Sequence, residues 1–120
     1  MRRALIAEDD CDLQYIFSFA LSNRSFDVQV ARDGQETLDR LALNSPDVLV
    51  LDINMPRVSG LDVLTYIHQH PEFDNLKIII VTGSMKAVFA PQIEYADLLL
   101  TKPVSLRELA NYAEELLAVN

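Results

Sequence analysis

Short runs of apolar residues alternate with helical patterns along this chain, and the alternation restricts its fold more than any other feature. The runs cover residues 4–7, 26–30, 48–51, 77–81 and 98–100. Helical patterns follow four of them, whereas after the fourth run Pro91 either breaks a helix or begins a short one. Strands joined by helices over such short connections form a parallel sheet with helices on both faces. The sequence predicts a doubly wound α/β domain of five strands with an irregular fourth helix.

Capping residues mark where the helices begin. Asp10 has the position of an N-cap, and Asp33 with Glu36 and Ser105 with Glu108 have the spacing of a capping box. The apolar residues at helical spacing predict the faces that pack on the sheet. These are Leu13, Ile16, Phe17, Ala20 and Leu21; Leu38, Leu41 and Ala42; Leu61, Leu64 and Ile67; and Leu106, Leu109, Ala110, Ala113, Leu116 and Leu117.

Length and charge narrow the class of protein. A chain of 120 residues has the usual size of one domain, so a single domain over residues 1–120 is expected. No apolar segment approaches the roughly 18 residues that span a membrane, and the sequence has no signal peptide pattern. The sequence therefore predicts a cytoplasmic protein with no membrane contact. The net charge of −8 argues against direct nucleic-acid binding. A single cysteine, Cys11, excludes an internal disulfide and a thiolate zinc site.

Polar residues directly follow four of the five predicted strands. Ligand sites in doubly wound folds lie beyond the carboxyl ends of the strands, so these residues are expected to meet. They are Glu8, Asp9 and Asp10, then Asp52, then Thr82, then Lys102. Converging carboxylates favour a hard cation such as Mg²⁺, and a lysine and a hydroxyl suit a phosphoryl group. Asp52, the carboxylate of the central strand, is the expected nucleophile for an aspartyl phosphate.

In this order the residues resemble the receiver domains of two-component response regulators, and the resemblance covers essentially the whole chain. The shared signature is the acidic pair Glu8 and Asp9, then Asp52, Thr82, and Lys102 with Pro103. The resemblance implies a flavodoxin-like fold with strand order 2-1-3-4-5. It also implies a phosphorylated switch rather than a dedicated enzyme, with self-catalysed phosphorylation and dephosphorylation.

The resemblance assigns roles to individual residues. Asp9 and Asp52 would bind Mg²⁺ or Mn²⁺ directly, Glu8 through water, and Asn54 through its backbone carbonyl. Asp52 would accept a phosphoryl group from a sensor histidine kinase or a phosphotransfer protein. Signalling would then proceed through contact with a downstream protein target or effector domain.

The resemblance also assigns the residues that respond to the phosphoryl group. Lys102 would pair with the phosphate, and its bond to Pro103 is expected to be cis. Thr82 would move to hydrogen-bond the phosphate. Ser84, two positions after Thr82, would tune hydrolysis together with Asn54.

The sequence departs from the family at the usual aromatic switch position, where it has Leu99, and in the segment 85–96, where Tyr95 replaces a usual glycine. These departures leave open an alternative, a receiver-like interaction module that works without phosphorylation. A haloacid dehalogenase-like phosphatase is the nearest enzyme alternative. Its general-acid Asp would fall on Asn54, and its other acids follow the nucleophile, whereas Glu8 and Asp9 precede Asp52.

Overall fold

The five apolar runs form one parallel sheet in the computed structural model, which describes residues 1–118. The strands are β1 (Arg3–Ala7), β2 (Asp27–Ala31), β3 (Val48–Leu51), β4 (Lys77–Thr82) and β5 (Leu98–Thr101). Their order across the sheet is β2-β1-β3-β4-β5, and each neighbouring pair is parallel. This confirms the predicted fold class and strand order.

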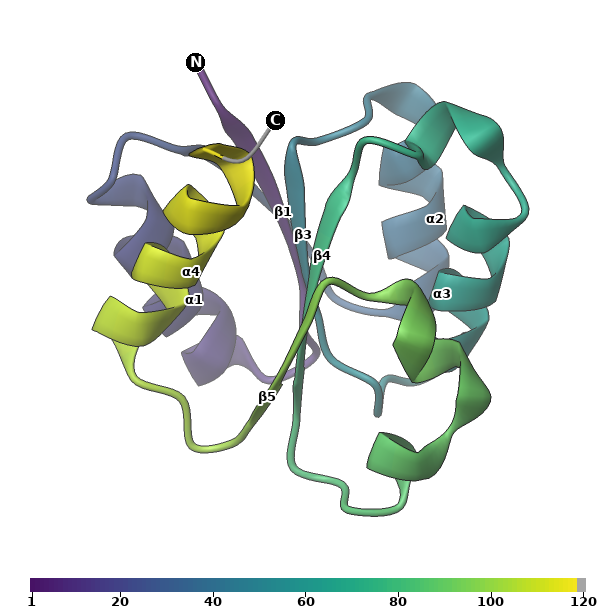
Figure 1. The fold of residues 1–120 in the computed structure, drawn as a ribbon. Helices are drawn as coiled ribbons and strands as arrows, with labels where there is room; N and C mark the ends of the chain where they lie inside the picture. The colour runs from purple at the N-terminus through teal and green to yellow at the C-terminus, as the bar shows by residue number, and fades with distance from the viewer. Residues whose placement is uncertain (119–120) are drawn as a thin grey trace.

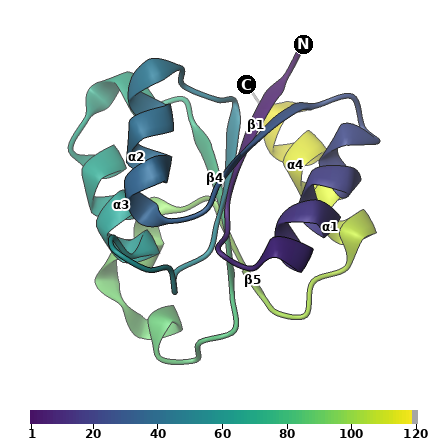
Figure 2. The ribbon, with the colours of Figure 1, turned by 180° about the vertical axis from the view of Figure 1, so that it is seen from behind.

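Helices cover both faces of the sheet (Figures 1 and 2). One face carries α1 (Cys11–Ser22) and α4 (Leu106–Ala118), and the other carries α2 (Gly34–Leu43) and α3 (Gly60–His68). The predicted caps are present, because Asp10 accepts from the N–H groups of Asp12 and Leu13, and Asp33 accepts from that of Glu36. None of the helices in residues 1–118 has the length and hydrophobicity needed to cross a membrane.

The strands supply a hydrophobic core to each face, because successive side chains of a strand point in opposite directions. Leu5, Leu49 and Ile80 pack with residues of α2 and α3, whereas Ile6 and Val50 pack with residues of α1 and α4. The central strand β3 is buried along its whole length. Burial on both faces explains its continuous apolar sequence.

Three residues predicted to face the core are exposed instead. Ile16 and Leu106 line opposite sides of an apolar groove between α1 and the segment after β5. In α2 the inward positions belong to Gly34, Thr37 and Leu41, which leaves Ala42 on the outside. Helical spacing identifies an apolar stripe, but the neighbouring element decides how much of that stripe is covered.

The irregular fourth helix is two short 3₁₀ helices, η2 (Ala87–Phe89) and η3 (Pro91–Tyr95). Pro91 is the first residue of η3, which agrees with the predicted short helix. A third 3₁₀ helix, η1 (Pro71–Phe73), follows α3. In Figure 1 the segment with η2 and η3 lies on the same side of the sheet as α3.

Candidate functional site

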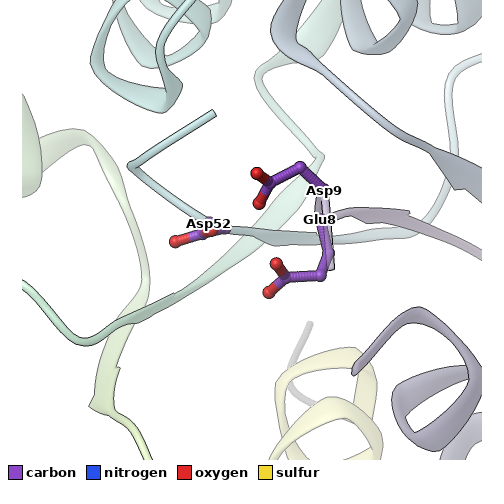
Figure 3. Close-up of side chains that lie close together, drawn as sticks. All are labelled: Glu8, Asp9 and Asp52. Carbon is purple, nitrogen blue, oxygen red and sulfur yellow. The ribbon is translucent and has the colours of Figure 1, made fainter. Parts of the chain in front are cut away.

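Three acidic residues meet at the carboxyl ends of two adjacent strands (Figure 3). Glu8 and Asp9 directly follow β1, and Asp52 directly follows β3. The register pairs Ala7 with Leu51, and the backbone N–H of Asp52 donates to the carbonyl of Ala7 at 2.9 Å. One carboxylate oxygen from each acid lies within 4.8 Å of the other two. The sheet thus brings together three of the four acids that the sequence predicted to converge, whereas the carboxylate of Asp10 caps α1 instead.

Glu8 is the most buried of the three acids, with 1% of its surface exposed. The backbone N–H of Asp10 donates to Oε2 at 3.1 Å, and Nζ of Lys102 lies 3.0 Å from Oε1. The side-chain amide of Gln14 donates to the backbone carbonyl of Glu8 at 2.7 Å. Gln14 was not predicted to belong to the site, since nothing in the sequence distinguishes it from other polar helix residues.

Lys102 connects the acidic residues to the end of β5. Its Nζ lies 3.6 Å from Oδ2 of Asp52, in addition to its contact with Glu8. Its backbone N–H donates to the carbonyl of Thr82 at 2.9 Å, which fixes the start of the loop on the neighbouring strand. The peptide bond between Lys102 and Pro103 is cis, as the resemblance implies.

The electrostatics of the site follow from burial and from opposite charge. Burial raises the pKa of both Glu8 and Asp52 above the ordinary carboxyl values of 4.5 and 3.8, and Lys102 only partly opposes these shifts. The charge of Asp9 adds to the increase in the pKa of Asp52. Burial alone would lower the pKa of Lys102, but Glu8 and Asp52 outweigh that effect and raise it above 10.5.

The donor set fits a hard divalent cation. Oε1 of Glu8 is buried, and no hydrogen bond of standard geometry reaches it within residues 1–118, although Nζ of Lys102 is 3.0 Å away. Two Mg–O distances of about 2.1 Å span about 4.2 Å. Oxygens separated by up to 4.8 Å therefore need only a small side-chain adjustment, or one water, to share an ion. Glu8, Asp9 and Asp52 have the chemistry that such an ion requires.

Thr82 and Ser84 are hydrogen-bonded within their own loop. Thr82 is fully buried at the end of β4, and its Oγ1 accepts a hydrogen bond from the N–H of Ser84 at 3.1 Å. Oγ of Ser84 in turn accepts from the N–H of Ala87 at 3.3 Å. On the loop after β3, the N–H of Asn54 lies 3.4 Å from Oδ1 of Asp52, which is a long contact.

Leu99 is partly buried and packs against the core on the α2 and α3 side of the sheet. The aromatic side chain closest to it in sequence, Tyr95, is 39% exposed and stacks on His68. The two ring centroids are 3.7 Å apart and the ring planes differ by 3°. This stack attaches η3 to the end of α3.

The sequence model of the response regulator receiver domain matches residues 4–114. This chain belongs to that family. The receiver domain is 35% identical over 107 residues to the transcriptional regulatory protein TrcR of Mycobacterium tuberculosis, covering 89% of this chain and 42% of TrcR. It is 37% identical over 109 residues to the response regulator MprA of Mycobacterium avium, covering 89% of this chain and 47% of MprA. The chain spans less than half the length of these relatives.

Solved receiver domains have the same architecture over nearly the whole chain. The receiver domain of Francisella response regulator 1452 gives a TM-score of 0.87 at 26% identity and covers 98% of both chains. The response regulator TrrA of Thermotoga maritima, solved in complex with Mg²⁺–BeF, gives a TM-score of 0.88 at 26% identity. That match covers 97% of this chain and 99% of TrrA. The family predicted from the residues is confirmed.

Proposed function

We propose that residues 1–120 make up one receiver domain in which Asp52 accepts a phosphoryl group, with Mg²⁺ or Mn²⁺ bound by Asp52, Asp9, the backbone carbonyl of Asn54 and, through water, Glu8. The observation that carries the proposal is the convergence of the acids and Lys102 around one strand end. TrrA, a relative in fold, was solved with Mg²⁺–BeF, which supports the choice of metal.

The residues of the site suit the transfer step. A carboxylate oxygen of Asp52 attacks phosphorus, a new O–P bond forms, and the P–N bond to the imidazole of a phosphohistidine breaks. Lys102 supplies positive charge next to the acceptor, and the hydroxyl of Thr82 is the predicted donor to the transferred group. When bound, Mg²⁺ offsets the negative charge of the phosphoryl oxygens. The domain acts as a switch with self-catalysed turnover rather than as a dedicated enzyme.

The proposed phosphodonor is a sensor histidine kinase or a phosphotransfer protein. Asp52 is 5% exposed, so a donor histidine must approach through the surface around the strand ends. The apolar groove lined by Ile16, Pro103 and Leu106 also includes Lys102, so a protein docked there lies next to the acceptor. Phosphohistidine is formed from ATP, and we therefore propose a cytoplasmic location. The output is contact with a downstream protein or effector domain, without direct nucleic-acid binding.

Labelling by a small-molecule phosphodonor tests the proposal. Acetyl phosphate with Mg²⁺ should phosphorylate the wild-type protein, excess EDTA should suppress the reaction, and Asp52→Asn should abolish it. Asp47→Asn is a matched control, because Asp47 precedes the same strand at its opposite end and its carboxylate accepts from the N–H of Arg3. Wild-type labelling of the Asp52 variant would disprove the assignment.

The second candidate function is a receiver-like interaction module that works without phosphorylation. Leu99 in place of an aromatic residue, and 3₁₀ helices in place of a fourth α-helix, favour it. The two functions differ in the same experiment. If the wild-type protein binds Mg²⁺ but acetyl phosphate does not phosphorylate it, the result would favour the interaction module that works without phosphorylation.

A further inference from the structure

The loop of residues 53–59 joins the end of β3, where Asp52 lies, to the start of α3. Its two ends are closed against each other by Gly60. The N–H of Gly60 donates to the carbonyl of Ile53 at 2.8 Å. A Cβ atom at Gly60 would lie 2.3 Å from the carbonyl oxygen of Asp52, so only glycine permits this approach. The stem of the loop is therefore hydrogen-bonded to Ile53 and packs closely against the backbone of Asp52.

The tip of the loop is attached to a different element, the N-terminus of α2. Nη2 of Arg57 lies 3.1 Å from Oδ1 of Asp33, the N-cap of α2. A Cβ atom at Gly34 would lie 1.8 Å from the carbonyl oxygen of Val58, so the first turn of α2 touches the loop backbone. Two independent contacts thus hold the tip of the loop against α2.

The backbone of Arg57 is unfavourable by itself. Its φ angle is 68°, a left-handed conformation that costs a residue with a Cβ about 1 kcal/mol or more. Contacts of the loop with its surroundings have to offset that cost. The ion pair with Asp33 is a contact that the Arg57 side chain itself makes.

Asp33 is a well-ordered partner for this arginine. The same Oδ1 that faces Arg57 also accepts the N–H of Glu36 at 2.8 Å, so the carboxylate is already fixed by its capping role. The Glu36 N–H lowers the pKa of Asp33 most, and Arg57 lowers it further. Because one partner is fixed in advance, the pair loses less side-chain entropy than a typical surface pair.

We propose that Arg57 and Asp33 are positioning residues for the metal site: their ion pair holds the 53–59 loop against α2 and so fixes the position of Asn54, whose backbone carbonyl is a proposed ligand. This inference rests on the proposed function for its metal. It adds that α2, which contributes no ligand, sets part of the metal affinity through the loop. Substitutions at the N-terminus of α2 should therefore change the metal affinity of the phosphorylation site.

Variants at both partners test the proposal by Mg²⁺ titration monitored through backbone amide NMR shifts. Arg57→Ala removes the guanidinium, and Asp33→Asn removes the charge but keeps an oxygen for the cap. Each should weaken Mg²⁺ binding about twofold to fivefold. The double variant should bind Mg²⁺ with the same affinity as the single variant that binds it more weakly, because each substitution removes the same ion pair. Additive losses, or wild-type affinity in both single variants, would overturn the proposal.

Matched controls separate the pair from general effects. Arg32→Ala removes a more exposed ion pair of Arg32 with Glu36 at the same end of α2 and should leave Mg²⁺ binding unchanged. Arg57→Gly removes the guanidinium but relieves the left-handed backbone, so it should retain more thermal stability than Arg57→Ala. Equal loss of affinity in the Arg32 variant would show that the effect is not specific to the pair.

Hydrogen exchange in EDTA gives a second readout that does not depend on the metal. The N–H groups of Val58 and Gly60 are hydrogen-bonded within the loop, so they should exchange about twofold to fivefold faster in Arg57→Ala and Asp33→Asn than in the wild type. If the wild type bound no Mg²⁺, the proposed function would fail. Faster exchange in the variants would still show that the ion pair of Arg57 with Asp33 holds the loop. Unchanged exchange in both variants would disprove the role of the ion pair in holding the loop.

Discussion

Nζ of Lys102 lies 3.0 Å from Oε1 of Glu8, a buried oxygen without a hydrogen bond of standard geometry in residues 1–118. The same Nζ is 3.6 Å from Oδ2 of Asp52, so the lysine lies closer to Glu8 than to the proposed phosphoacceptor. Glu8 therefore holds the Lys102 ammonium within reach of Asp52. This relationship predicts that removing the lysine affects the stability of the domain as well as its chemistry.

Replacing Lys102 by Met should destabilise the folded protein at pH 7 by about 1–2 kcal/mol, because Glu8 loses its positive partner in a buried position. Methionine keeps the unbranched stem, so the variant should retain its fold and its circular dichroism spectrum. The loss should shrink as the pH falls, because protonated Glu8 no longer needs the partner. Urea unfolding at two pH values measures both effects. Equal stability of the two proteins would show that Lys102 does not stabilise the buried charge of Glu8.

Replacing Asp52 by Asn should stabilise the protein in EDTA at pH 7 by about 1 kcal/mol. Burial raises the pKa of Asp52 in the folded state, so its ionised form opposes folding above the ordinary value of 3.8. The stability of the wild type should therefore rise toward that of the variant as the pH falls through the raised pKa. Thermal unfolding from pH 7 down to about pH 4 tests this sign, with the exposed Asp74→Asn as a control that should change little.

Mg²⁺ should stabilise the wild type by mass action, by about 1.4 kcal/mol at a concentration ten times its Kd. Asp9→Asn should reduce that gain, because it removes a proposed ligand. Asp9 is exposed, so this variant should leave the stability in EDTA nearly unchanged. Denaturation with and without Mg²⁺ separates the two effects. A full Mg²⁺ response in the Asp9 variant would argue against direct coordination by this residue.

Replacing Gly34 by Ala should destabilise the domain by about 2–4 kcal/mol, because the new Cβ would lie 1.8 Å from the carbonyl oxygen of Val58. Gly83→Ala is the matched control, since its Cβ would meet no atom closer than Cδ of Lys102 at 4.0 Å. Chemical denaturation of the two variants provides the comparison. Similar stability of the Gly34 and Gly83 variants would show that the loop after β3 can move away from α2 at little cost.

Local patterns in the chain were sufficient for the sheet and for the positions of the site residues. Five apolar runs predicted the parallel strands, and the polar residues that follow them predicted the meeting of Glu8, Asp9, Asp52 and Lys102. The order of the strands came from the family resemblance. Asp52 follows a strand buried on both faces, so its environment was predictable from the run before it. The caps at Asp10 and Asp33 were equally local, because each involves residues within three positions.

Only the tertiary structure decided how distant segments meet. The sequence did not reveal that Arg57 would pair with Asp33, that Gln14 would hold Glu8, or that Ile16 and Leu106 would border a groove instead of lying in the core. Periodicity and capping report on the few residues around a position. An ion pair over 24 residues depends on how the strands and helices pack in three dimensions.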